Sequence, residues 1–119
     1  MTAVLDASAL IALLAGEPGA AAAAEAARVG AITSVNLAEA RDRLTRSTRS
    51  ADATTQALEA VLDAGLRVLA CDRELAEHAA DLRAVHYDRA SSAISLADCF
   101  AIAAALRTGG RLVSSDGTQ

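Results

Sequence analysis

Short apolar runs alternate along this sequence with longer segments rich in helix-forming residues, and this alternation limits the chain to few architectures. Parallel strands need a long connection between them and prefer a helix for it. The pattern therefore predicts an α/β fold with a central parallel sheet of about four strands. The runs expected to form these strands are Thr2 to Leu5, Ala31 to Thr33, Leu66 to Ala70 and Arg111 to Ser114.

The helices are predicted from the apolar pattern and from residues typical of helix ends. Pro18-Gly19 breaks the first helical region in two, and Gly109-Gly110 is typical of a helix C-terminus. Ser34, Asp72 and Ser95 are expected N-caps, since their side-chain oxygens accept hydrogen bonds from the first turn. The expected helices run from Ala7 to Ala15, Ala20 to Val29, Val35 to about Ser47, Ala51 to Ala64, Asp72 to about His86 and Leu96 to Thr108.

The composition fits one domain covering residues 1–119, because a chain of this length buries one core but not two. Apolar residues make up 53% of it and aromatic residues 2%, so the core must consist of Ala, Leu, Val and Ile.

No run approaches the roughly 20 apolar residues of a membrane span, and no basic flank of a secretory signal is present. A cytoplasmic protein without membrane contact is expected. Cys71 and Cys99 lack CxxC spacing and are expected to be buried, reduced thiols.

The charge pattern gives a mixed indication for nucleic acid. A net charge of −4 argues against a generally basic binding surface. All 11 basic residues are arginines, the better partner of phosphate oxygens, and four lie close together at Arg41, Arg43, Arg46 and Arg49. This stretch is either a guide for nucleic acid or a solvated helix face.

Four acids are expected to meet at one edge of the sheet. Ligands of α/β proteins bind at the carboxyl ends of the strands, and Asp6 and Asp116 directly follow the first and last predicted strands. A helix between two parallel strands runs antiparallel to them, which brings Glu39 and Asp98, near helix starts, to the same edge. Clustered carboxylates repel each other unless a divalent cation neutralises them. Ligands that are all oxygens suit Mg²⁺ or Mn²⁺ better than zinc.

Each acid also has a purely structural explanation. Asp6 can cap the helix that follows it, and Asp98 can complete a capping box at the start of its helix. Glu39 can pair with Arg43 one turn later, and Asp116 can be a solvated tail residue. The joint placement of the four acids at one edge is what favours a site.

The segments around these acids form three motifs, which read DASALIALL from Asp6, SVNLAEARDRL around Glu39, and SLADCFAIAAALRTGGRLVSSD across Asp98 and Asp116. These motifs resemble those of PIN-domain ribonucleases of the VapC toxin family. The match covers essentially the whole chain, and the order and spacing of the motifs are together fairly specific. The resemblance implies a PIN-like three-layer α/β/α fold and a metal-dependent endoribonuclease, the toxin of a type II toxin–antitoxin system.

The same resemblance implies roles for the acids and a set of partners. Asp6 and Asp98 would be direct ligands of Mg²⁺ or Mn²⁺, with Glu39 and Asp116 completing the catalytic pocket directly or through water. Hydrolysis of an RNA phosphodiester would leave a 5′-phosphate and a 3′-hydroxyl. The implied partners are the RNA substrate, a cognate VapB-type antitoxin and a second copy in a homodimer. The residues expected to support the acids are Ser8, Asn36 and Ser114.

Alternatives to this interpretation stay open. Similar proteins continue past the position of Asp116 with another short strand, so either this sequence is trimmed or its sheet is one strand smaller. A PIN-like scaffold without activity, acting only as a binding partner, is one alternative; the intact acids argue against it, but residues alone do not prove turnover. A phosphate-accepting receiver domain would ordinarily show paired acids after the first strand and a late Lys, whereas this chain has a lone Asp6 and no Lys. His78 and His86 lack a ligand partner at suitable spacing and are expected at the surface.

Overall fold

Four parallel strands form the central sheet of the computed structural model, which describes residues 2–88 and 94–115. The order across the sheet is β3-β2-β1-β4, and Val4 of β1 lies opposite Ala31 on one side and Leu112 on the other. The predicted parallel sheet of four strands is therefore confirmed. The strands are β1 (Ala3–Leu5), β2 (Ala31–Thr33), β3 (Arg67–Leu69) and β4 (Arg111–Val113).

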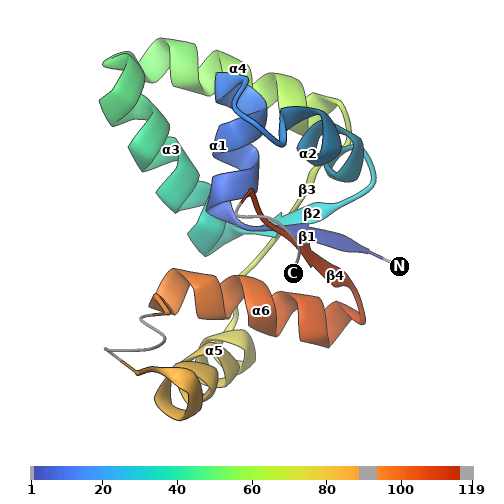
Figure 1. The fold of residues 1–119 in the computed structure, drawn as a ribbon, viewed down its shortest axis with the longest axis vertical. Coiled ribbons are helices and arrows are strands. Elements are labelled where there is room, and N and C mark those ends of the chain that lie inside the picture. Colours follow the sequence, from blue (N-terminus) through green and yellow to red (C-terminus); the bar gives the residue numbers. More distant parts are fainter. Residues whose placement is uncertain (1, 89–93, 116–119) are drawn as a thin grey trace.

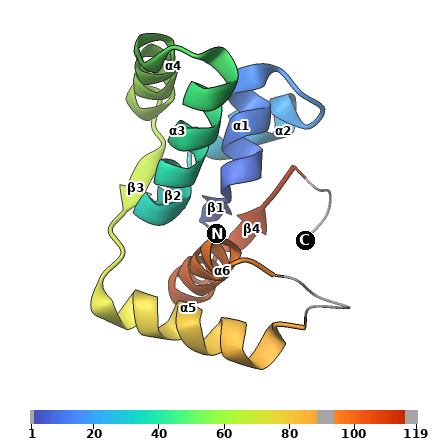
Figure 2. The ribbon, with the colours of Figure 1, turned by 90° about the vertical axis from the view of Figure 1, so that its left-hand side faces the viewer.

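Helices cover both faces of this sheet, as Figures 1 and 2 show. One face carries α1 (Ala7–Ala15), α2 (Ala20–Ala27), α3 (Ser34–Thr48) and α4 (Ala51–Asp63). The other face carries α5 (Arg73–His86) and α6 (Leu96–Thr108). The three layers of the expected α/β/α architecture are thus present in the described residues.

Strand β1 serves both cores because successive side chains of a strand point to opposite faces. Ala3 and Leu5 pack into the core on the side of α1 to α4, and Val4 packs into the core on the side of α5 and α6. Both cores consist mainly of Ala and Leu, as the composition requires. Small side chains let the helices lie close to the sheet, so the residues at helix starts are brought near the strand ends.

Side-chain caps begin the helices that reach the carboxyl edge of the sheet. Asp6 caps α1 and Ser95 caps α6, the latter as predicted. The prediction for α3 was wrong by one residue, because Thr33 is the N-cap and Ser34 is already helical. Thr33 ends β2 with extended backbone and offers its own hydroxyl to the amide of Asn36, which starts the helix one residue earlier.

The end of α2 and the burial of Cys71 differ from the sequence-based expectations. Helix α2 ends at Ala27, two residues before the expected Val29. Both cysteines are free, and Cys99 is buried as expected, whereas Cys71 is only partly buried. Within the described residues, no single helix is long and apolar enough to span a membrane; α1 and α2 meet that test only together, across a bend of 113°.

Candidate active site

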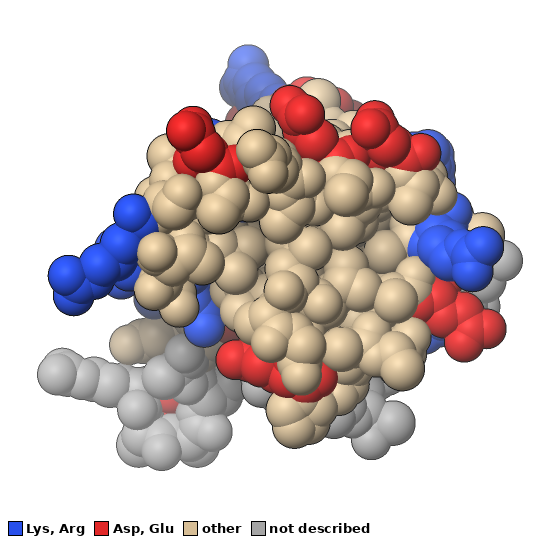
Figure 3. Space-filling model, turned by 90° about the horizontal axis from the view of Figure 1, so that it is seen from above, with Lys and Arg blue, Asp and Glu red and all other residues tan. Residues whose placement is uncertain are grey.

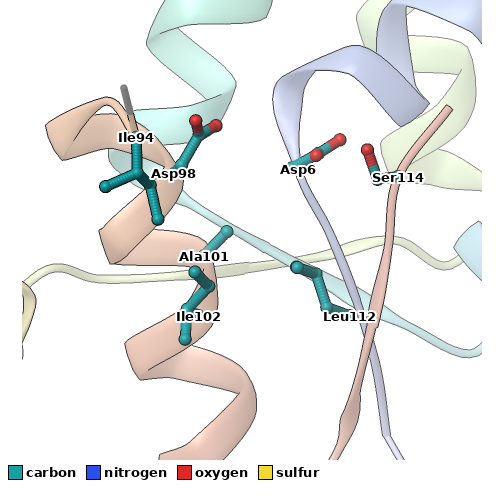
Figure 4. A pocket seen from close by; sticks show the side chains of 7 residues that line it. All are labelled: Asp6, Ile94, Asp98, Ala101, Ile102, Leu112 and Ser114. Carbon is teal, nitrogen blue, oxygen red and sulfur yellow. The ribbon is translucent and has the colours of Figure 1, made fainter. Parts of the chain in front are cut away.

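Asp6 and Asp98 lie on opposite sides of one pocket at the carboxyl edge of the sheet, as Figure 4 shows. Asp6 directly follows β1, whereas Asp98 lies in the first turn of α6, which runs antiparallel to the strands. The pocket has a volume of about 170 Å³. Its lining consists of these two acids, Ser114 and an apolar part formed by Ile94, Ala101, Ile102 and Leu112.

The Asp6 carboxylate is held firmly although it lies in a pocket. It is only 9% exposed, and its Oδ1 accepts hydrogen bonds from the amide of Ala9 at 2.9 Å and the hydroxyl of Ser8 at 2.7 Å. Both bonds go to the same oxygen, so within the described residues Oδ2 is left available to a ligand. The structural role as a cap and a role in the pocket are therefore compatible.

The Ser8 hydroxyl joins Asp6 to the end of β4. Its oxygen lies 3.1 Å from Ser114 Oγ and accepts a hydrogen bond from the amide of Ser115, also at 3.1 Å. These contacts cross more than a hundred residues of sequence and connect the ends of two adjacent strands. Ser8 and Ser114, both expected to support the acids, thus lie beside Asp6.

Asp98 is exposed and takes part in a capping box. Its amide donates to Ser95 Oγ at 3.0 Å, and its Oδ2 accepts from the amide of Ser95 at 3.3 Å. No hydrogen bond to its Oδ1 occurs within residues 2–88 and 94–115. As with Asp6, the cap occupies one carboxylate oxygen and leaves the other for the pocket.

Glu39 of α3 lies within electrostatic reach of both pocket acids but does not line the pocket. Burial raises the pKa of its carboxyl, Arg43 one turn later lowers it, and the charges of Asp98 and Asp6 raise it further; the net shift is upward. The i,i+4 interaction with Arg43 is thus present, yet it does not outweigh the burial. Asp116, the fourth predicted acid, lies outside the described residues.

Replacing Glu39 by Gln is expected to raise the free energy of unfolding of the metal-free protein at pH 7. The pKa of this carboxyl is higher in the folded state than in the unfolded state, where it is near 4.5. Its contribution to stability is therefore fully present only below pH 4.5 and is lost as the pH rises through the folded pKa. The stability gained by the substitution should therefore shrink as the pH falls through the folded pKa of Glu39 towards 4.5, and should be absent well below 4.5. Urea unfolding in EDTA at several pH values measures it. Glu59→Gln on α4 is the control, and an equal gain in both variants would contradict the expectation.

Asn36 occupies the junction between the two halves of the site. It is fully buried, its side-chain oxygen accepts from the Thr33 hydroxyl, and its Nδ2 donates to the carbonyl oxygen of Ala97 at 3.0 Å. Asn36 is not one of the residues that line the pocket. Instead it links the start of α3 to the first turn of α6.

The arginine-rich part of α3 lies beside the site. Arg46 forms an ion pair with Asp42 at 2.9 Å, and Arg41 donates to Thr55 at 2.8 Å, all of them exposed or nearly so. A separate hollow of about 420 Å³ between α1 and α3 is lined in part by Arg43 and Arg46. Of these arginines, Arg43 is the one whose charge reaches Glu39.

The donor set determines which cation this pocket suits. Within the described residues, no group of three or more His, Cys, Asp or Glu side chains is arranged to hold a metal ion. The two carboxylates of the pocket are both oxygen donors, and Mg²⁺ is commonly held by one or two carboxylates while it keeps several waters. The residues present therefore fit Mg²⁺ or Mn²⁺ and do not fit zinc.

The sequence alone did not indicate the apolar part of the pocket. Asn36 was expected to support the acids, but its hydrogen bond to the Ala97 carbonyl was not predicted. Ala101 and Ile102 look like ordinary core positions of α6, and Leu112 like an ordinary strand residue. Only the antiparallel packing of α6 beside β4 brings them together below the acids.

The fold of this chain is similar to the folds of two solved toxin structures. A structure of VapC20 from Mycobacterium tuberculosis, a toxin that cleaves the sarcin-ricin loop, superimposes with a TM-score of 0.77 at 22% identity, covering 95% of this chain and 88% of that one. A toxin–antitoxin complex from Klebsiella pneumoniae gives a TM-score of 0.69 at 22% identity, with coverage of 95% and 85%. These two likenesses concern the fold.

Family assignment comes from the sequence. None of the curated protein sequences matches this chain. The PIN domain family, however, matches residues 3–119, which is nearly the whole chain. This match argues against the alternative of a receiver domain. The expected PIN-like architecture is thereby confirmed. This chain belongs to the PIN domain family.

Proposed function

We propose that this chain is a metal-dependent endoribonuclease and the toxin of a type II toxin–antitoxin system. The observation that carries the proposal is the placement of Asp6 and Asp98, from two different elements, on opposite sides of one pocket in a PIN-domain chain. The fold shared with VapC20, a sarcin-ricin loop cleaving toxin, supports RNA as the substrate.

Asp6 and Asp98 would hold Mg²⁺ or Mn²⁺, with Glu39 and Asp116 completing the acidic pocket directly or through water. When bound, the cation supplies Lewis-acid activation of the phosphate and of the attacking water, and stabilises the charge that develops. Ser8 orients the Asp6 carboxylate through its hydrogen bond to Oδ1. The apolar wall of Ala101, Ile102 and Leu112 limits access of water from below the acids.

We further propose that the Arg43 guanidinium binds a phosphate of the RNA near the one that is cleaved. It lies one turn beyond Glu39 and lines the hollow between α1 and α3. A guanidinium suits phosphate because its donors match two oxygens at once. This local positive charge is compatible with a chain whose net charge is −4.

A VapB-type antitoxin is the proposed protein partner, and the apolar groove between α1, α2 and α4 is its proposed docking surface. The groove has a volume of about 550 Å³ and is lined by Leu13, Leu14, Ala24, Ala27, Arg28, Ala57, Ala60, Val61 and Ala64. Figure 3 looks onto this side of the molecule and shows a broad uncharged area bordered by charged residues. An amphipathic helix fits such a groove.

A homodimer stays a prediction, which light scattering of the purified chain would test.

The proposal is tested by incubating the purified chain, free of any partner, with mixed cellular RNA in EDTA, Mg²⁺ or Mn²⁺. Discrete fragments are expected with either cation and none in EDTA. The fragments should carry 5′-phosphates, which a 5′-phosphate-dependent exonuclease detects. If the folded protein binds Mn²⁺ by calorimetry but leaves RNA intact, the binding-only PIN scaffold becomes the better explanation.

Replacing Ser8 by Ala is expected to weaken Mn²⁺ binding by roughly tenfold, the lower end of what loss of a ligand-orienting hydrogen bond costs. The variant loses the bond to Asp6 Oδ1 and the contacts with Ser114 and Ser115. Calorimetric titration with Mn²⁺ measures the change. Ser47→Ala, on the exposed end of α3, should bind as the parent protein does. Equal affinities for Ser8→Ala and the parent would show that Asp6 needs no such support.

A further inference from the structure

We propose that Asn36 is a positioning residue that fixes the Asp98 carboxylate relative to Asp6 by holding the carbonyl of Ala97. Its role rests on the proposed function in one respect, namely that Asp98 is a metal ligand there. The hydrogen bond from Asn36 Nδ2 to Ala97 O is 3.0 Å long and joins residues 61 positions apart in sequence. It connects the first turns of α3 and α6.

The bond acts on Asp98 because of peptide geometry. The carbonyl of Ala97 and the Cα of Asp98 belong to one planar peptide unit. Fixing the oxygen of that unit therefore fixes the rotation of the first turn of α6 about the helix axis. The direction in which the Asp98 side chain leaves the helix is fixed at the same time.

Asn36 is itself immobile. Both Asn36 and Thr33 are fully buried, and Thr33 Oγ1 accepts from the Asn36 amide at 3.0 Å. The Thr33 hydroxyl then donates its proton to Asn36 Oδ1. This arrangement settles which end of the Asn36 side chain donates, because a backbone carbonyl such as Ala97 O can only accept. The donor is thus anchored to the last residue of β2.

The other hydrogen bonds of this turn, among the described residues, do not reach the sheet side of the site. The capping box between Ser95 and Asp98 moves with α6 as one unit. From outside the helix, Arg83 of α5 donates to Ile94 O at 3.1 Å, just before α6 begins. Within the described residues, Asn36 supplies the hydrogen bond that reaches this turn from the side of the sheet. Removing it leaves this turn held from the side of the sheet by apolar packing, without a hydrogen bond that fixes its orientation.

The first test measures amide hydrogen exchange in metal-free Asn36→Ala and Asn36→Leu proteins. Leu fills the space of Asn without donating, so it guards against failure of the smaller variant to fold. Exchange of the Asp98 and Cys99 amides should become about tenfold faster than any change in global stability explains. The amides of Leu75 and Ala76, in the equivalent capped turn of α5, serve as the internal control.

Thr54→Ala is the matched variant, because Thr54 is also buried and hydrogen-bonded but lies on α4. It should lower stability without a selective effect on the first turn of α6. If the Asp98 and Cys99 amides of the Asn36 variants exchange no faster than in Thr54→Ala, the positioning role is overturned. This readout does not depend on metal or RNA.

The second test titrates the same variants with Mn²⁺ alone. Asn36→Ala should weaken binding by about tenfold or more, while Thr54→Ala binds normally. In the Asp98→Asn background, Asn36→Ala should produce no further loss, since its effect passes through Asp98. A full, additive loss in that background would overturn the proposal. If the parent protein binds no Mn²⁺ while the exchange effect is present, the positioning role stands and the proposed metal-dependent function fails.

Discussion

Replacement of Asp6 or Asp98 by Asn is expected to reduce cation-dependent RNA cleavage by about 100-fold or more, because each removes a negative ligand from a site where the cation contributes several kcal/mol. Asn was chosen because its amide oxygen can keep the caps. It can still accept from Ala9 at position 6 and from the amide of Ser95 at position 98. The fold should therefore survive while the chemistry is lost. Initial cleavage rates in Mg²⁺ and Mn²⁺ measure the effect.

The control for this pair is Glu59→Gln, which removes one exposed negative charge from α4, a helix that does not line the pocket. Its cleavage rate should equal that of the parent protein. Thermal unfolding in EDTA should show Asp6→Asn and Asp98→Asn to be folded. Cleavage that persists in both variants, with unchanged cation dependence, would rule out the pocket as the active site.

The arrangement of strands and helices could be predicted because the local signals agreed with one another. Each strand is a short apolar run, and each intervening segment has helical caps and enough length for a crossover. Where two neighbouring residues can both cap a helix, the sequence does not show which of them is the N-cap. Thr33 and Ser34 both offer a hydroxyl, and only the extended backbone at the end of β2 selects Thr33 as the cap of α3.

For the site, the sequence predicted only which edge of the sheet carries it. Parallel topology brings Asp6 and Asp98 to that edge, but their separation depends on how α6 packs beside β4, which no local pattern records. Glu39 was expected in the pocket and instead lies beyond its lining, within electrostatic reach. Asp6 is also the N-cap of α1, and Asp98 completes the capping box of α6, so at these positions local preference and the proposed function favour the same residue type.

Replacing Gly110 by Ala is expected to lower the free energy of unfolding by about 3 kcal/mol, the upper end of what overpacking usually costs. A Cβ at this position would lie 2.1 Å from the carbonyl oxygen of Thr2 and 3.0 Å from Thr108 Oγ1. The first obstacle is backbone and cannot rotate away. The same Thr2 oxygen accepts from the amide of Arg111 at 2.9 Å, which starts the pairing of β4 with β1. Relief of the clash must therefore move β4, and with it Ser114 at the pocket.

A variant at Gly109 distinguishes the steric clash at Gly110 from the general effect of replacing a glycine. It ends α6 with φ of 65°, a left-handed conformation, but a Cβ there would meet nothing within 4 Å. Gly109→Ala should therefore cost only about 1 kcal/mol of backbone strain and leave cleavage nearly unchanged. Urea unfolding and RNA cleavage of the two variants distinguish the mechanisms. If Gly110→Ala is no less stable than Gly109→Ala, β4 does not approach β1 in this register, and the pocket that depends on that register must be arranged differently.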